Sequence, residues 1–324
     1  MEHLISVGSQ TFVSEQLRNR AWLIKVVLAF AAVYLIWGST YLAIQIAIKT
    51  LPIFFMAGLR FLIAGGLLYV FASRSAPKPT ANEWRLAALV GGLLLLGGNG
   101  LVCFGQQYVP SGLAALLVSS LPLWMAIINW LFFTGRKPML RTIISILIGL
   151  IGVVMLLGGS PLYDDSGKYL YALAVLLAPV SWAFGSLRSR QGGLPKSPWL
   201  STAMQMICGG IMLLVAGLVH GEVDDMNLSM FSVESVLALL YLIVFGSLIA
   251  FTAFVWLLQN VDPERVATYA FVNPVVAVLL GWMIAGEQIK GWQIPGMVLV
   301  VGAVAMTVLY PKEALPNSAA KTLD

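Results

Sequence analysis

Charge is the first thing that this sequence has little of. Asp, Glu, Lys and Arg make up 10% of its 324 residues, and hydrophobic residues make up 59%. Soluble domains carry about 25% charged residues, and a single soluble core cannot bury so much apolar surface. The composition therefore excludes an ordinary soluble domain and predicts an all-α integral membrane protein, because a bilayer accepts apolar side chains on the outside of helices.

Cysteine and histidine are scarce as well, with two of each. Cys103 and Cys208 each lie inside an apolar run, where cysteine packs as a small hydrophobe. His3 and His220 lie outside the apolar runs, and none of these four side chains has the spacing of a metal site. We therefore expect no metal, no haem and no other cofactor.

Acidic residues are missing from the middle of every apolar run, since all fourteen Asp and Glu residues lie in tails, loops or run ends. Proton-coupled carriers commonly use an intramembrane carboxylate or histidine as the relay. The sequence thus favours facilitated diffusion or exchange, with Glu83 and Glu287 as the alternative coupling groups. A membrane enzyme would need a catalytic cluster near one face. The one candidate cluster, Asp224 and Asp225 near His220, is explained by a solvated loop, so we expect no enzyme.

Long apolar runs are what the sequence has in abundance. A hydrocarbon core about 30 Å thick needs roughly 20 apolar residues in a helix. Ten such runs occur, at 26–47, 51–73, 85–105, 111–134, 141–159, 169–188, 199–219, 234–258, 263–285 and 292–311. The predicted fold is ten transmembrane helices.

The basic residues lie in short clusters between these runs, which is the topology signal of a membrane protein and not a nucleic-acid patch. If both termini are cytoplasmic, fifteen Lys and Arg residues fall on the inside and three on the outside, with Arg60 inside a run. We therefore expect a multi-pass membrane protein with both termini in the cytoplasm.

The chain also contains an internal repeat with an offset of about 150 residues. The matched positions are Gly38–Ser39 with Gly185–Ser186, Val109 with Val261, Pro122 with Pro274, Gly135 with Gly286, and Gly152 with Gly302. Because five spans per half is an odd number, the two halves must insert with opposite topology, as in many secondary transporters. The predicted division is a tail at 1–25, repeats at 26–160 and 169–311, and a tail at 312–324.

Arg60 is the most informative polar residue, because it stands inside the second run. An arginine in mid-membrane costs at least about 2.5–3.5 kcal/mol on insertion scales and usually faces a cavity or a partner. The alternative is that its side chain reaches the membrane surface or binds backbone carbonyls.

In the first run, Tyr34, Trp37, Tyr41 and Gln45 are spaced by 3, 4 and 4 residues, so they form one stripe on a helix. Such a stripe can be plain helix packing, but aromatic walls with few polar points also line small-molecule pockets. The residues that we expect to line a substrate site are Trp37, Tyr41, Gln45, Arg60, Asn99, Trp182, Tyr269 and Asn273. Gly38 and Gly185 would permit close helix contact, and Pro122 and Pro274 would set two kinks.

The motifs IWGSTY at 36–41, GLRF at 58–61, GNG at 98–100, VPSG at 109–112, SWAFGS at 181–186 and YAFVNPVVAVLLG at 269–281 resemble the EamA-type drug/metabolite transporter superfamily. The resemblance covers about 27–310. It implies two inverted five-helix repeats in the bacterial inner membrane and export of metabolites such as amino acids.

The expected partners are a small-molecule substrate and the lipid bilayer, with no nucleic acid. One cation, Arg60, and no opposing acid would suit a carboxylate or phosphate on the cargo. The alternatives are a lipid-linked, nucleotide-sugar or drug-like cargo, and, in another class, a receptor or scaffold without transport. The sequence leaves monomer and homodimer equally open.

Overall fold

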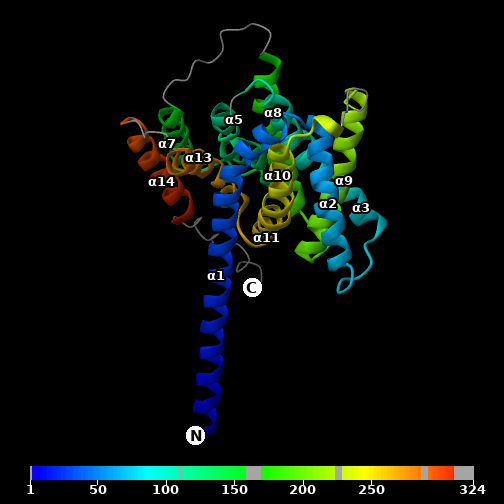
Figure 1. Cartoon of the computed structure of the whole chain (residues 1–324). Coiled ribbons are helices and arrows are strands. Elements are labelled where there is room, and N and C mark those ends of the chain that lie inside the picture. Colours follow the sequence, from blue (N-terminus) through cyan, green and yellow to red (C-terminus); the bar gives the residue numbers. More distant parts are fainter. Residues whose placement is uncertain (1, 110, 158–168, 223–227, 286–290, 310–324) are drawn as a thin grey trace.

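In the computed structural model, which describes residues 2–109, 111–157, 169–222, 228–285 and 291–309, every regular element is a helix. Most follow one another through short turns, as Figure 1 shows. The helices are α1 (Glu2–Ala47), α2 (Ile53–Ala72), α3 (Ala81–Gly91), η1 (Gly92–Gly100), α4 (Leu101–Gly105), α5 (Ser111–Val118), α6 (Leu121–Ile128), η2 (Asn129–Thr134), α7 (Leu140–Leu157), α8 (Tyr169–Arg190), α9 (Pro198–Val219), η4 (Leu228–Met230), α10 (Val233–Tyr241), η5 (Leu242–Phe251), α11 (Thr252–Asn260), α12 (Pro263–Val266), α13 (Tyr269–Ala285) and α14 (Gln293–Leu309).

Within the described residues, seven helical stretches are long and apolar enough to cross a membrane. They are Arg20–Ala47, Ile53–Ala72, Ala81–Gly105, Leu113–Thr134, Tyr169–Arg190, Pro198–Val219 and Val233–Asn260. They coincide with seven of the ten predicted runs. The other three runs correspond to α7, α13 and α14, of 18, 17 and 17 residues. At 1.5 Å per residue, 17 residues span only about 26 Å.

The ninth predicted run is not one continuous helix. It begins with the short helix α12, which ends at Val266, and α13 starts at Tyr269. The Thr268 hydroxyl donates to the Arg265 carbonyl at 2.6 Å and closes the turn between the two helices. Competition of this kind between a hydroxyl and the helical backbone is common for Ser and Thr.

The two predicted kink prolines occupy different local settings. Pro122 stands in the first turn of α6, directly after a break at which Ser119 and Ser120 donate to the carbonyls of the preceding turn. Pro274 lies inside α13. A proline in a first turn replaces an N–H that has no helical partner, whereas an interior proline removes a hydrogen bond.

The helices pack in pairs that join the first part of the chain to the second. α2 packs along α9, and α7 packs along α14. α1 contacts α10, η5, α11 and α13, while α8 contacts η1, α4, α5 and α6. In Figure 1, α7, α13 and α14 lie on one side of the molecule and α2, α3 and α9 on the other.

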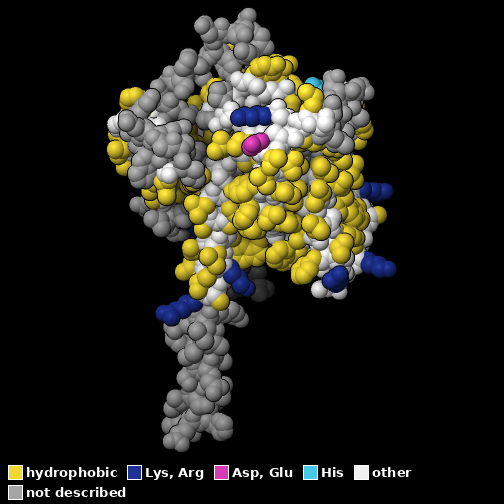
Figure 2. Space-filling model, viewed as in Figure 1, with side chains coloured by type: hydrophobic (Ala, Val, Ile, Leu, Met, Phe, Trp, Pro, Cys, Tyr) yellow, Lys and Arg dark blue, Asp and Glu magenta, His cyan; other side chains and the backbone are white. Residues whose placement is uncertain are grey.

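Apolar side chains cover the outside of this bundle as well as its core. Figure 2 shows a broad hydrophobic surface across the middle of the visible face, with most of the visible Lys and Arg side chains along its lower rim and another, beside an acidic side chain, above it. Leu67, Phe71 and Leu237 are among the exposed large hydrophobic residues. An apolar belt with charges at its edge is the surface expected of a protein embedded in lipid.

Glycine allows α2 and α9 to approach closely. A Cβ atom on Gly58 would lie 2.9 Å from the Gly210 carbonyl oxygen, and one on Gly210 would lie 3.0 Å from the Gly58 carbonyl oxygen. Backbone therefore touches backbone at this crossing, as is typical of membrane helices with small residues at their interface.

The variant Gly58→Val should lower the melting temperature of the purified protein in detergent. Overpacking of a tight contact costs about 1–3 kcal/mol, and the obstructing group here is backbone that cannot rotate away. Gly66→Val on the same helix is the matched control, because a Cβ atom on Gly66 would meet nothing within 4 Å. Equal melting temperatures for the two variants would contradict this account of the crossing.

Candidate functional site

A central cavity opens between helices from both parts of the chain. It is lined by Trp37, Thr40, Tyr41, Ile44, Arg60, Phe61, Gly98, Asn99, Val102, Val118, Leu121, Ala178, Pro179, Trp182, Phe251, Tyr269 and Asn273. The space open to water in it is about 70 Å³, enough for several water molecules but below the roughly 300–1,000 Å³ of ligand pockets. The cavity is therefore narrow in this conformation.

Arg60 stands in the wall of this cavity, at the middle of α2. Its side chain is only 3% exposed, so it does not reach the membrane surface. The guanidinium Nε donates to the hydroxyl of Ser247 at 2.7 Å, and Nη1 has no hydrogen-bond partner. Among the described residues, no carboxylate pairs with Arg60.

The π-helical segment η5 shapes the place where the guanidinium lies. A Cβ atom on Gly246 would lie 2.8 Å from Nη2 of Arg60, so the cation rests against bare backbone. The Trp37 indole Nε1 donates to the Gly246 carbonyl at 3.2 Å. Gly246 and Ser247 therefore hold Arg60 and Trp37 together, and sequence reasoning missed both. The available signal was a serine within the otherwise apolar stretch LIVFGSLIAF.

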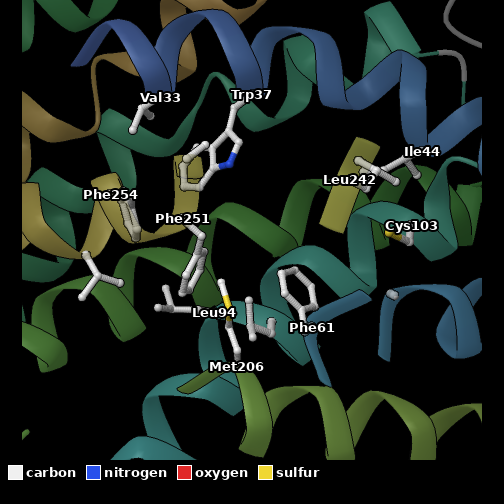
Figure 3. Packing of buried hydrophobic residues seen from close by; sticks show 14 of the residues in the cluster. Val33, Trp37, Ile44, Phe61, Leu94, Cys103, Met206, Leu242, Phe251 and Phe254 are labelled. Atoms are coloured by element: carbon white, nitrogen blue, oxygen red, sulfur yellow. The ribbon is translucent and has the colours of Figure 1, made fainter. Parts of the chain in front are cut away.

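Aromatic rings surround Trp37. Its ring centroid lies 4.8 Å from Tyr269, 5.0 Å from Phe254 and 5.6 Å from Trp182, with Phe251 at 6.4 Å. Figure 3 shows Trp37 facing Phe251 and Phe254 across the core. Contacts at these distances and tilted angles are favourable for aromatic pairs, so the cavity has rigid apolar walls.

Three buried polar atoms of the cavity residues have no hydrogen-bond partner. They are the donors Nη1 of Arg60 and Nε1 of Trp182, and the acceptor Oδ1 of Asn273. Asn99 accepts a weak hydrogen bond from the Cys103 thiol at 3.5 Å. Because unpaired buried polar groups cost free energy, this set can bind a ligand that carries both an anionic group and a donor.

The other predicted residues lie elsewhere. Gln45 lines a second, separate cavity, described below, and not the central one. Gly38 faces α13, where a Cβ atom would lie 2.6 Å from Cβ of Val276. Gly185 faces η1, where a Cβ atom would lie 2.9 Å from Cγ of Leu94. Both glycines thus sit at close helix contacts beside the cavity.

A second cavity, which we call the vestibule, opens at the face where α1 ends and α2 begins. It encloses about 680 Å³ and is lined by Gln45, Ile48, Lys49, Leu51, Pro52, Ile53, Gln106, Gln107, Tyr108, His220, Gly221 and Glu222. The central cavity and the vestibule share no lining residue, but Tyr41 and Gln45 follow each other on one face of α1.

Polar contacts close the opposite face, at which α8 and α11 end. Arg190 donates to the Val261 carbonyl at 2.7 Å and pairs with Asp262 at 3.4 Å. Asn129 donates to Glu264 at 3.2 Å. Deeper in the bundle, the hydroxyls of Tyr34 and Thr268 lie 2.6 Å apart. These contacts tie the α11–α12 connection to the ends of the neighbouring helices.

The family model described as "EamA-like transporter family" matches the chain twice, at residues 24–158 and 169–309. The chain belongs to this family. The resemblance seen in its motifs is thereby confirmed. The family consists of transporters and not of enzymes.

Relatives extend over most of the chain. The uncharacterized inner membrane transporter YedA of Escherichia coli (strain K12) is 39% identical over 283 residues, which cover 87% of this chain and 90% of YedA. The uncharacterized transporter YoaV of Bacillus subtilis (strain 168) is 25% identical, over 88% of this chain and 97% of YoaV. A solved crystal structure with 20% identity has a TM-score of 0.70 and covers 88% of this chain and 97% of its own, which shows the fold.

The variant Ser247→Ala should lower the melting temperature, because a buried guanidinium that loses a partner keeps its desolvation cost, about 1–3 kcal/mol. The double variant Arg60→Met/Ser247→Ala should melt at a higher temperature than Ser247→Ala alone, since it also removes the buried charge. A melting temperature for Ser247→Ala equal to that of wild type would show that the hydrogen bond does not support Arg60.

Proposed function

We propose that this protein is a bacterial inner-membrane exporter of small amphipathic metabolites that carry a carboxylate, with amino acids as the main class. The observation that carries the proposal is Arg60, a buried cation in the wall of a central cavity with one guanidinium nitrogen unpaired. Mid-membrane cations that face a cavity commonly mark a substrate pathway.

The proposed architecture is ten transmembrane helices in two inverted five-helix repeats. The double match to the family model supports it, since each match spans one predicted repeat. The packing supports it too, because exchanging the halves turns the contact of η1 with α8 into that of η5 with α1. The π-helical segments η1 and η5 start at Gly92 and Leu242, 150 residues apart. The helices α7, α13 and α14 would then cross a locally thinner part of the bilayer.

The proposed orientation has both termini in the cytoplasm. The face closed by the contacts of Arg190 and Asn129 also carries Arg74 and Lys78. Its excess of basic residues favours it as the cytoplasmic face. The vestibule then opens to the outside. In this assignment the structure is an outward-open state, and cargo from the cytoplasm enters only after the contacts of Arg190 and Asn129 have separated.

The cavity groups suit an amino acid with an apolar side chain. The unpaired donors of Arg60 and Trp182 would bind its carboxylate by charge-assisted hydrogen bonds. Oδ1 of Asn273 would accept from its ammonium group. The rings of Trp37, Tyr41 and Tyr269 would cover the side chain. Because the free space is only about 70 Å³, the cavity would widen as the repeats move apart.

The positions of the described Asp and Glu residues support transport without proton coupling. None of the residues that line the central cavity is Asp or Glu. Glu83, one alternative coupling group, closes a capping box with Thr80 at the start of α3, where its carboxylate accepts from the Thr80 amide at 2.7 Å. Glu287 lies outside the described residues. We therefore propose that the cargo gradient, or exchange against a second cargo, drives the flux.

Proteoliposomes test the proposed function directly. Uptake of a labelled panel led by L-leucine and L-phenylalanine should proceed down a substrate gradient alone. It should fall about tenfold or more in Arg60→Ala, because a hydrogen bond to a charged group contributes about 1.5–3 kcal/mol. The exposed Arg74→Ala is the control and should retain flux. Uptake that requires a pH gradient and survives Arg60→Ala would refute both the site and the uncoupled mechanism.

Removing the closing contacts should favour the inward-open state. The variant Arg190→Ala loses its bonds to Val261 and Asp262. The reporter is Val33→Cys, a buried position on α1, in a background with Cys103→Ser and Cys208→Ser. This thiol should react several-fold faster with N-ethylmaleimide when Arg190→Ala is added. The gain is modest because Arg190 and Asp262 are 39% and 38% exposed. Arg188→Ala, which loses only a local bond to the Gly192 carbonyl, is the control. Equal labelling rates in both variants would exclude this role.

A further inference from the structure

The vestibule has the size and chemistry of a binding site in its own right. Its volume of about 680 Å³ falls within the roughly 300–1,000 Å³ typical of small-molecule pockets. Its wall combines the apolar side chains of Ile48, Leu51 and Ile53 with polar groups from three helix ends. None of these residues belongs to the central cavity.

Gln106 lies between the vestibule and the central cavity, at the end of α4. Its side chain is 3% exposed, and its Nε2 donates to the carbonyl of Tyr41 at 3.1 Å. Its Oε1 is buried and has no partner. A buried amide oxygen without a donor is unfavourable, so a ligand that reached this atom from the vestibule would supply the missing hydrogen bond.

Lys49 provides the cation of the vestibule. Its side chain is exposed, and within the described part of the chain no carboxylate or hydrogen-bond acceptor pairs with it. Glu222, the one acid among the described residues of the wall, is already engaged, since its two oxygens accept from the amides of Phe54 and Phe55 at 3.0 and 2.8 Å. These amides form the start of α2, whose partial positive charge offsets the carboxylate. Within the described residues, the charge of Lys49 is thus available to a ligand.

The vestibule repeats the chemistry of the central cavity. In the centre, the cation of Arg60 accompanies the unpaired amide oxygen of Asn273; in the vestibule, the cation of Lys49 accompanies the unpaired amide oxygen of Gln106. Each set offers a positive group to a carboxylate and an acceptor to an ammonium group. A molecule suited to one set is therefore suited to the other.

We propose that the vestibule is a second, outer binding station for the same amino-acid cargo, with Lys49 binding the carboxylate and Oε1 of Gln106 accepting from the ammonium group. The class of cargo rests on the proposed function. The hydrogen bond from Gln106 to the Tyr41 carbonyl joins the two stations physically, because Tyr41 lines the central cavity. Cargo leaving the centre would meet this station before it reaches the outer solution.

The stoichiometry of binding tests the proposal. Equilibrium dialysis of labelled L-leucine against the full chain in nanodiscs should give two equivalents per protein for wild type and one for Lys49→Ala and for Gln106→Leu. Lys196→Ala, exposed on the opposite face, is the matched control and should keep both. Because Lys49 is exposed, its substitution leaves the packing intact.

Each result of this titration decides between the two stations. One equivalent in wild type that Arg60→Ala abolishes and Lys49→Ala leaves unchanged would overturn the outer station and leave the proposed function standing. One equivalent that Lys49→Ala abolishes and Arg60→Ala leaves unchanged would support the outer station and refute the central one. No saturable binding of L-leucine would overturn both.

Thiol protection gives a second, independent measurement. Gln107→Cys, in the wall of the vestibule, should react with a membrane-impermeant methanethiosulfonate, and L-leucine should slow this reaction several-fold. Protection should persist in Arg60→Ala, in which the central station is disabled, and disappear in Lys49→Ala. Protection that vanishes in Arg60→Ala and persists in Lys49→Ala would overturn the outer station.

Discussion

The burial of one guanidinium in mid-membrane is the constraint around which the rest of this structure is arranged. A cation away from water must be offered hydrogen-bond acceptors and room. Ser247 supplies the acceptor, and the bare backbone at Gly246 supplies the room. Both come from η5, whereas Arg60 comes from α2, so the charge joins a helix of the first part of the chain to a helix of the second. The same π-helical segment accepts the indole N–H of Trp37, which links the polar centre to the aromatic wall.

The two parts of the chain share their packing but not their chemistry. α2 carries Arg60 at its centre, while α9, which packs along it, contains no charged residue. The π-helical segments η1 and η5 each accept a side-chain hydrogen bond from a helix of the other part of the chain, since Ser181 donates to the Leu93 carbonyl of η1 as Trp37 does to the Gly246 carbonyl of η5. Such segments often occur at functional sites. Here each segment offers a backbone carbonyl to a side chain from the other part of the chain.

Much of the fold could be predicted from the sequence because hydropathy and charge placement are one-dimensional signals. Seven predicted runs became membrane-length helices, and Arg60, Trp37, Tyr41 and Trp182 line one cavity. Shorter features escaped prediction because they depend on contacts. The break before Tyr269 needs the hydroxyl of Thr268, and the role of Ser247 needs α2 beside η5. Gln45 lies one helical turn after Tyr41 on the same face of α1, yet the two residues line different cavities. Helical periodicity predicts the shared face but not the boundary between the cavities.

The pair of Arg190 and Asp262 differs from every contact in the core by being more than one third exposed to solvent. Attraction between exposed charges is screened over a Debye length of about 8 Å at physiological ionic strength. The Tyr34–Thr268 contact and the aromatic rings beneath are shielded from this screening. The Arg190–Asp262 pair is therefore sensitive to salt, whereas the buried contacts beneath it are not. In the proposed transport cycle, a change in the ionic strength of the solution at this face would therefore shift how often the face opens without altering the contacts of the central cavity.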